Sequence, residues 1–190
     1  ESLSLVVASL ADRENADIRL EAAIAKYFGS EASWTMADNA LQIRGGRGFE
    51  QEKSLKERGE SSSFPIERIL RDIRINRIIE GTSEIMRLFI AREAMDVHLK
   101  HIFPLLNPKT PSKEKVKAVW TATKFYGKWY PKLFLPAQRS FPVEHLTSSN
   151  ISHLKYIAKA AKRLGKGLFH AMAKYQQKLE KEQTLLRQYV

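Results

Sequence analysis

The segment DIRLEAAIAKYFGSEASWTMADNALQIRGGRGF, residues 17–49, decides the fold class that the sequence predicts. Its large apolar side chains recur at helical spacing and form one stripe, which consists of Leu20, Ile24, Tyr27, Phe28, Trp34 and Leu41. Glu31 and Asp38 interrupt this stripe. Asp17 is a suitable residue to open the helix, and the glycines of RGGRGF end it. We therefore predict one long amphipathic helix.

The same periodicity extends through the rest of the chain. Further helices are predicted at about 2–11, 66–74, 82–98 and 111–129, and the polar stretch 50–65 predicts a surface loop with one helical turn. In the fourth of these helices one side carries Val116, Val119, Trp120 and Tyr126. A last helix of about 35 residues is predicted by a stripe that consists of Ile151, Leu154, Ala158, Ala161, Leu164, Leu168, Met172 and Tyr175. Strand-like alternation is almost absent, so we expect an all-α fold.

Composition is that of a globular chain. Of the 190 residues 43% are apolar, with nine Phe, six Tyr and three Trp, so a core can form. The absence of cysteine excludes disulfides and Cys-ligated metals, and it fits an intracellular location. No apolar run approaches the ~20 residues that span a bilayer. The opening ESLSLVVASLADREN reads as the middle of a helix, so we expect a piece of a larger protein.

Charge divides the chain into two halves. Residues 1–95 carry 14 basic and 16 acidic side chains, net −2, whereas residues 96–190 carry 18 and 5, net +13. The sequence FPLLNPKTPSK between the halves contains three prolines and predicts a linker. We expect a first domain at 1–100, a linker at 101–112 and a basic helical extension at 113–190.

One side of the last predicted helix carries a row of lysines. Lys155, Lys159, Lys162 and Lys166 recur opposite the apolar stripe. A solvated face is the ordinary interpretation of such a row. The net charge of this half, with aromatic residues near by, also suits an anionic membrane surface.

Two glycine motifs carry the candidate chemistry. In LQIRGGRGF, residues 41–49, glycines let backbone amides approach a ligand, although they also serve as a simple helix end. In RIIEGTSEIM, residues 77–86, Thr82 or Ser83 can cap a helix, whose start can in addition bind an anion. Glu80 stands between Ile79 and this helix start. A carboxylate screened from water there would be a good proton acceptor, so Glu80 is a candidate general base.

The order of these motifs resembles the C-terminal region of the acyl-CoA dehydrogenases. The likeness covers residues 1 to about 99 and includes LQIRGGRGF, PIERILRD, EGTSEI and RLFIAREAMD. It is nearest to the very-long-chain-like members, which carry an extra helical domain, and residues 100–190 occupy that position. The resemblance implies α,β-dehydrogenation of fatty acyl-CoA thioesters with FAD in the bacterial cytoplasm or the mitochondrial matrix. It also implies that other domains of the enzyme lie outside these residues.

The resemblance assigns roles to residues of the second motif. Glu80 matches the base that removes the α-proton of the acyl-CoA, and Gly81 lets the chain pass close to this substrate. Thr82 and Glu84 match positions that contact the FAD. Electrons are expected to pass on to an electron-transfer flavoprotein.

The first motif gains a role in the same way. Gln42, Ile43, Arg44, Gly45 and Gly46 match a segment that contacts the FAD of a neighbouring subunit. A homodimer or higher homo-oligomer is therefore expected. Arg44 departs from the residues usual at its position, as Arg47 does; these arginines can meet a phosphate or remain exposed.

Other classes of function receive less support from the residues. The row of Arg68, Arg71, Arg74 and Arg77 is interpreted as structural ion pairing, so no nucleic acid is expected as a partner. His98 and His101 have no acidic or Cys residue at ligand spacing, so no metal is expected. The alternative to an enzyme is a non-catalytic helical interaction module that binds an anionic membrane surface or nucleic acid.

Overall fold

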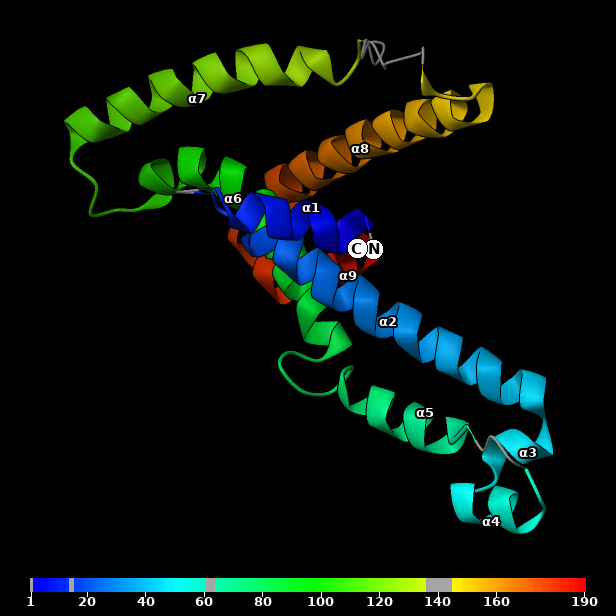
Figure 1. Ribbon diagram of the computed structural model, residues 1–190. Coiled ribbons are helices and arrows are strands. Elements are labelled where there is room, and N and C mark those ends of the chain that lie inside the picture. The colour runs from blue at the N-terminus through cyan, green and yellow to red at the C-terminus, as the bar shows by residue number, and fades with distance from the viewer. Residues whose placement is uncertain (1, 14–15, 61–63, 136–144) are drawn as a thin grey trace. The chain divides into compact units, whose positions relative to one another are not determined.

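The computed structural model describes residues 2–13, 16–60, 64–135 and 145–190, and all regular structure in them is helical (Figure 1). The prediction of an all-α fold is thus confirmed. The helices fall into two compact units, one of Glu1–Glu93 with the terminal Val190, the other of Ala94–Tyr189. Among the described residues, no helix is long and apolar enough to cross a membrane.

The first unit is built around one long helix. Its elements are α1 (Ser2–Ala11), α2 (Arg19–Arg44), α3 (Gly46–Phe49), α4 (Glu52–Glu57) and α5 (Ile66–Ile75). Helices α5 and α1 both contact α2 (Figure 1). The buried positions of α2 are the small residues Ala23, Ser30 and Ala37, because small side chains let neighbouring helices approach closely. Phe28, which was predicted on the inner stripe, is instead 62% exposed.

The charged segment after α3 is better ordered than a polar loop. The predicted helical turn is present as α4, and its Leu55 is only 1% exposed, the most buried large side chain described in the chain. Ion pairs of 2.6 Å between Lys56 and Glu52 and of 3.1 Å between Arg58 and Glu50 surround it. This one leucine anchors a segment that its composition predicted to be fully exposed.

Helix α6 (Ser83–Leu106) begins where the sequence predicts and ends later. The Thr82 hydroxyl accepts a hydrogen bond of 3.2 Å from the Ile85 amide, which is the expected N-cap. The helix continues beyond residue 98 into the segment expected to be a linker and includes Pro104, two residues before its end. A proline there removes one hydrogen bond to the carbonyl four residues earlier, and the helix tolerates this loss near its end. Ile85, in the first turn of α6, is exposed.

The second unit has an aromatic core. Its remaining elements are α7 (Ser112–Lys132), α8 (Ser148–Tyr175), the 3-10 helix η2 (Gln176–Lys181) and α9 (Gln183–Gln188). The core rings, which come from α6, α7 and α8, are His98, Phe125, Tyr126, Trp129 and Phe169. The ring centroids of His98 and Trp129 are 4.6 Å apart.

The helices of this unit differ from the prediction at three points. Val116, Val119 and Trp120 were placed on one side of their helix with Tyr126; all three are exposed, and of these four residues Tyr126 alone joins the core. Helix α7 also continues past its predicted end at about residue 129, through Pro131 to Lys132. The predicted last helix ends earlier, as α8 has 28 residues and η2 follows it.

Candidate functional site

Glu80 lies at the tip of a closed loop between α5 and α6. The Ser83 amide donates a hydrogen bond of 3.2 Å to the Arg77 carbonyl, which closes the loop at its base. Glu80 has a φ of 54° and Gly81 a φ of 95°. A left-handed conformation is ordinary for glycine and uncommon for glutamate. The surroundings must therefore hold Glu80 in place.

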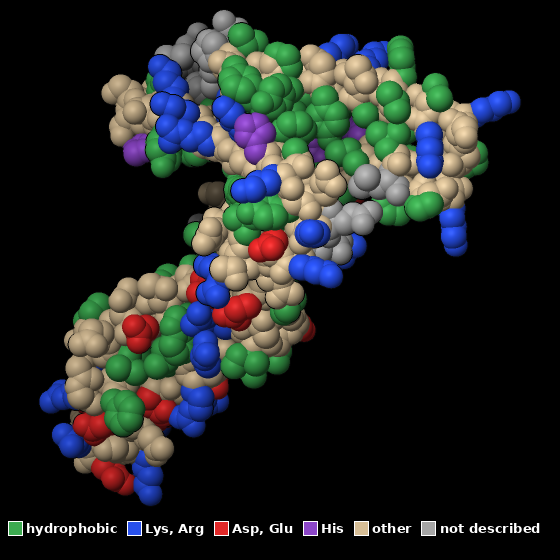
Figure 2. All heavy atoms as spheres, turned by 180° about the vertical axis from the view of Figure 1, so that it is seen from behind, with side chains coloured by type: hydrophobic (Ala, Val, Ile, Leu, Met, Phe, Trp, Pro, Cys, Tyr) green, Lys and Arg blue, Asp and Glu red, His purple; other side chains and the backbone are tan. Residues whose placement is uncertain are grey.

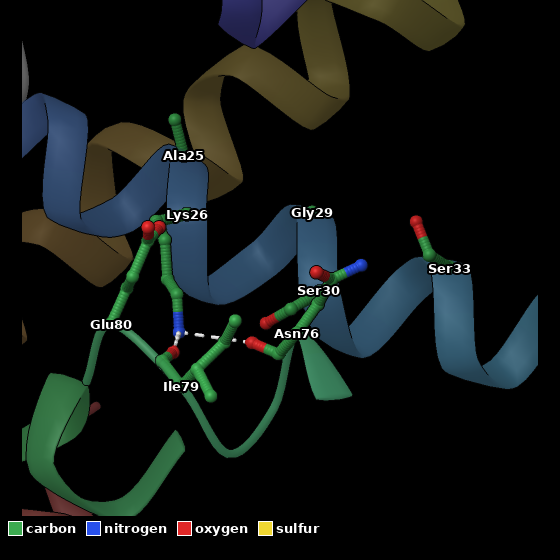
Figure 3. Close-up of a pocket in the computed structure, with 8 residues that line it drawn as sticks. All are labelled: Ala25, Lys26, Gly29, Ser30, Ser33, Asn76, Ile79 and Glu80. Carbon is green, nitrogen blue, oxygen red and sulfur yellow. Dashed lines mark hydrogen bonds between the residues drawn. The ribbon is translucent and has the colours of Figure 1, made fainter. Parts of the chain in front are cut away.

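Lys26 of α2 supplies one part of this hold. Its ammonium donates hydrogen bonds to the carbonyls of Asn76, at 3.0 Å, and Ile79, at 3.3 Å (Figure 3). It donates a third to the carbonyl of Gly81. These carbonyls lie on both sides of Glu80 in the chain. An ammonium has three protons, so the three bonds use its full donor capacity.

Glu31, one turn further along α2, holds the base of the same loop. Its Oε1 accepts a hydrogen bond of 2.8 Å from Arg77 Nε and another from the Ser83 hydroxyl. Burial acts to raise the pKa of Glu31, but the hydrogen bonds from Ser83 and Arg77, with the charges of Arg77 and Arg87, outweigh it and lower this pKa. Glu31 therefore stays ionised, as an acceptor for both donors requires.

The structure shows no hydrogen bond or ion pair of the Glu80 carboxylate with any other described residue. Its side chain extends toward α2 and lines a pocket of about 260 Å³ (Figure 3). The other residues that line this pocket are Ala25, Lys26, Gly29, Ser30, Ser33, Asn76 and Ile79.

The water-excluding surroundings expected around Glu80 are not supplied by the described residues. Glu80 is exposed, and its neighbours Ile78 and Ile79 are 48% and 47% exposed. Any enclosure of this carboxylate requires protein or ligand beyond those residues. The other members of the motif lie beside it. The Thr82 hydroxyl caps α6 and Glu84 is exposed in the first turn of that helix.

The glycine motif forms an open turn at the far end of α2. Gly45 has a φ of 58° and separates α2 from α3, and Gln42 and Ile43 before it are exposed, Ile43 to 86%. A Cβ added at Gly45 or Gly46 would meet no atom within 4 Å. A flat ligand could therefore lie against this backbone, and the residues fit one wall of a flavin site.

Arg44 and Arg47 both form ion pairs. Arg44 makes an ion pair of 2.6 Å with Glu60, and Arg47 makes one of 3.3 Å with the same carboxylate. The two arginines thus tie the glycine turn to the end of the α4 segment. A phosphate at this turn would compete with Glu60 for them.

The glycine turn and the Glu80 loop lie far apart within one chain. Lys26 and Arg44 are separated by 18 residues of α2, which corresponds to about 27 Å of helix. A single small group cannot contact both ends of this helix.

The arginine row of α5 forms the contacts expected of structural ion pairing. Arg71 pairs with Glu67, and Arg68 lies 3.7 Å from Asp72. Arg74 lies over the ring of Trp34, with 5.3 Å between the guanidinium carbon and the ring centroid. The row therefore forms ion pairs within α5, and through Arg74 it also contacts α2.

Lys26 and Glu31 were not predicted as site residues. Glu31 left one signal in the sequence, since it interrupts an apolar stripe. Lys26 left none, because a single lysine on an amphipathic helix is most often a solvated side chain. Its contacts depend on a loop about 50 residues later in the chain.

A second hollow lies on the basic unit. It has a volume of about 540 Å³ and is lined by Leu133, Leu135, Lys155, Lys159, Lys162, Arg163 and Lys166. Lys162 donates a hydrogen bond of 2.6 Å to the Leu135 carbonyl. In the part of the chain that the structure describes, none of these five cations pairs with a carboxylate, and the sequence of α8 contains no acid. Figure 2 shows Lys and Arg among hydrophobic side chains over α7 and α8.

Comparison with known proteins gives consistent matches. The family profile for the C-terminal domain of acyl-CoA dehydrogenases matches residues 1–95. Over 182 residues the chain is 44% identical to the probable acyl-CoA dehydrogenase FadE10 of Mycobacterium bovis and of Mycobacterium tuberculosis, which covers 95% of this chain and 28% of those proteins. It is 47% identical over 91 residues to the very long-chain specific mitochondrial acyl-CoA dehydrogenase of Homo sapiens, covering 48% of this chain and 12% of that protein. The chain thus spans little more than a quarter of the mycobacterial relatives.

Proposed function

This chain belongs to the acyl-CoA dehydrogenase family, and we propose that it is the C-terminal part of an enzyme that introduces an α,β double bond into fatty acyl-CoA thioesters. The observation that carries the proposal is the free carboxylate of Glu80, held at the tip of a loop and open to a pocket. Such a reaction belongs to fatty acid β-oxidation. The relatives are named acyl-CoA dehydrogenases, and we propose an acyl-CoA as the substrate of this protein as well.

Glu80 acts in this proposal as a general base. It accepts the proton that leaves the α-carbon, while a hydride leaves the β-carbon and the two carbons form the double bond. FAD, when bound, supplies the acceptor for this hydride. Gly81 leaves room for the thioester beside the base. A positioned base of this kind typically contributes about 10²–10⁴-fold to the rate.

The FAD is proposed to be held by two segments from different subunits. Thr82 and Glu84 would contact it near the base, at the start of α6. The open turn of Gln42, Ile43, Arg44, Gly45 and Gly46 would contact the FAD of the neighbouring subunit. Because the two segments lie at opposite ends of α2, this arrangement requires a homodimer at least.

Further partners belong to the same proposal. Electrons would leave through an electron-transfer flavoprotein. The basic unit within 113–190, whose five cations around Leu133 and Leu135 form no ion pair with a described carboxylate, would rest on an anionic membrane surface. The enzyme would then work in the bacterial cytoplasm or the mitochondrial matrix, peripheral to the inner membrane.

Substitution of the base tests the proposed reaction. In the full-length protein we expect Glu80→Gln to bind FAD normally but to lose at least about 100-fold in the rate of anaerobic flavin bleaching by acyl-CoA, because an amide cannot accept the proton. Glu57→Gln, an exposed acid of α4, is the matched control and should bleach as wild type. An E80Q rate within twofold of wild type would refute the assignment of the base.

The alternative, a non-catalytic module, rests on the unpaired basic hollow of the second unit. It predicts a full-length protein that is colourless, does not bleach and still binds anionic surfaces. Flavin absorbance of the purified full-length protein therefore separates the two functions.

A further inference from the structure

We propose that Lys26 is the positioning residue of the candidate base: its ammonium fixes the peptide units around Glu80 and so directs the carboxylate into the pocket. This inference rests on the proposed function of Glu80. It concerns a residue of α2 that lies outside both sequence motifs.

The pattern of hydrogen bonds carries the inference. Lys26 bonds to the carbonyls of Ile79 and Gly81, the residues that flank Glu80, and to that of Asn76 at the entrance of the loop. All three ammonium protons are used on backbone oxygens. The Glu80 carboxylate therefore does not form an ion pair with the nearest lysine and is left free to accept a proton.

The backbone conformation explains why such a hold is needed. Glu80 has a φ of 54°, which L-residues with side chains adopt only when their surroundings impose it. The bond to Ile79 holds the peptide unit before Glu80, and the bond to Gly81 holds the peptide unit after Gly81, so the Glu80–Gly81 pair is restrained at both ends. Without these bonds the loop can relax toward ordinary conformations, in which the carboxylate points elsewhere.

A second anchor makes the role of Lys26 separable from folding. Glu31 binds Arg77 and Ser83 at the base of the loop and does not involve Lys26. The amide of Ser83 closes the loop independently. Loss of the Lys26 bonds should therefore loosen residues 78–82 while the loop stays attached to α2.

The test is Lys26→Met in the full-length, flavin-loaded protein, with Lys53→Met on the exposed face of α4 as the control. We expect the flavin reduction rate at saturating acyl-CoA to fall about 10–100-fold, with flavin content and acyl-CoA affinity unchanged. Amide hydrogen exchange of the peptide covering 77–83 should accelerate in K26M and not in K53M. A merely structural defect would instead lower flavin content and affinity together.

Defined outcomes overturn the inference. A folded K26M protein that reduces flavin within twofold of wild type, with unchanged exchange at 77–83, would refute it even if E80Q is inactive. If K26M fails to bind flavin, the variant Lys26→Arg decides. Its planar guanidinium cannot donate from one nitrogen to three converging carbonyls, as an ammonium does, so flavin reduction should again be slower. A wild-type rate of K26R would refute the inference. Full activity of E80Q would instead reject the proposed function itself.

Discussion

Gly81 is the residue of the loop where a side chain is least tolerated. Its φ of 95° lies in the region that glycine adopts readily, and an added Cβ would lie 2.7 Å from the Met86 sulfur. The sulfur lies near the end of a flexible side chain and can move aside. The backbone conformation cannot be changed without turning the following residue, Thr82, away from its capping position.

We expect Gly81→Ala to destabilise the protein by about 1–2 kcal/mol, since alanine pays the cost of a positive φ. The measurement is urea denaturation followed by circular dichroism. Gly29→Ala in α2 is the control, because a Cβ there meets nothing within 4 Å and alanine favours a helix by about 0.5–1 kcal/mol. Equal stabilities of G81A and wild type would show that the loop does not depend on this conformation.

Among single residues, the sequence predicted the candidate base but not the side chains that hold its loop. Glu80, Gly81 and Thr82 form a local motif, so their proximity needs no knowledge of the fold. Lys26 and Glu31 act through a loop some 50 residues away, and no local pattern reports such a contact. The carboxylate of Glu80 was expected to be screened from water beside Ile79, but neighbours in sequence do not enclose a side chain by themselves.

His98 shows how an element depends on its buried polar residue. It lies on α6 against the rings of Tyr126 and Trp129, with Nδ1 3.2 Å from the Tyr126 hydroxyl. Burial lowers the pKa of His98, and the nearby His101 lowers it further. Burial also raises the pKa of the Tyr126 phenol. The neutral imidazole is therefore the form that packs.

The second unit should lose stability in mild acid. A histidine whose pKa is lowered by folding contributes stability that is complete above its unfolded pKa of about 6.5 and is lost as pH falls through the folded value. We expect His98→Phe to reduce this pH dependence, measured by urea denaturation between pH 7.5 and 5. His153→Phe, at an exposed position of α8, should retain it. An unchanged slope in H98F would assign the acid sensitivity to other groups.

Helices were predictable as elements, and their ends and packed faces less so. Periodicity located α2, α5 and the start of α6, because each has its own apolar stripe or cap. Pro104 and Pro131 misled the end points, because a proline usually ends or kinks a helix, whereas α6 and α7 each run past theirs, to Leu106 and Lys132. In α7, Tyr126 and Trp129 pack against rings of other helices, whereas Val116, Val119 and Trp120 are exposed, a difference that a continuous stripe in the sequence cannot reveal.

On the scale of the whole molecule, charge is the clearest division. Residues 1–95 are near neutrality with paired arginines, whereas residues 96–190 carry net +13. The carboxylates of the first unit are mostly engaged by neighbouring cations. In the second unit too few acids are present to do the same, so its positive field extends into solvent.

We expect the protein to sediment with vesicles that contain phosphatidylglycerol and not with vesicles of phosphatidylcholine alone. Each cation near an anionic surface contributes roughly 1 kcal/mol, so the double substitution Lys155→Glu and Lys159→Glu should abolish most binding. The pair Lys53→Glu and Lys56→Glu in the first unit is the control. Binding that persists as salt rises from 50 to about 500 mM would contradict an electrostatic contact.

The acid-free helix α8 also bears on how experiments with this protein are interpreted. A surface of that kind attracts any polyanion released during cell lysis, including ribosomal and chromosomal fragments, without recognising a base sequence. Nucleic acid that copurifies would then reflect a low salt concentration in the buffer and not a specific interaction. Washing at high ionic strength before any binding assay separates this adsorption from genuine affinity.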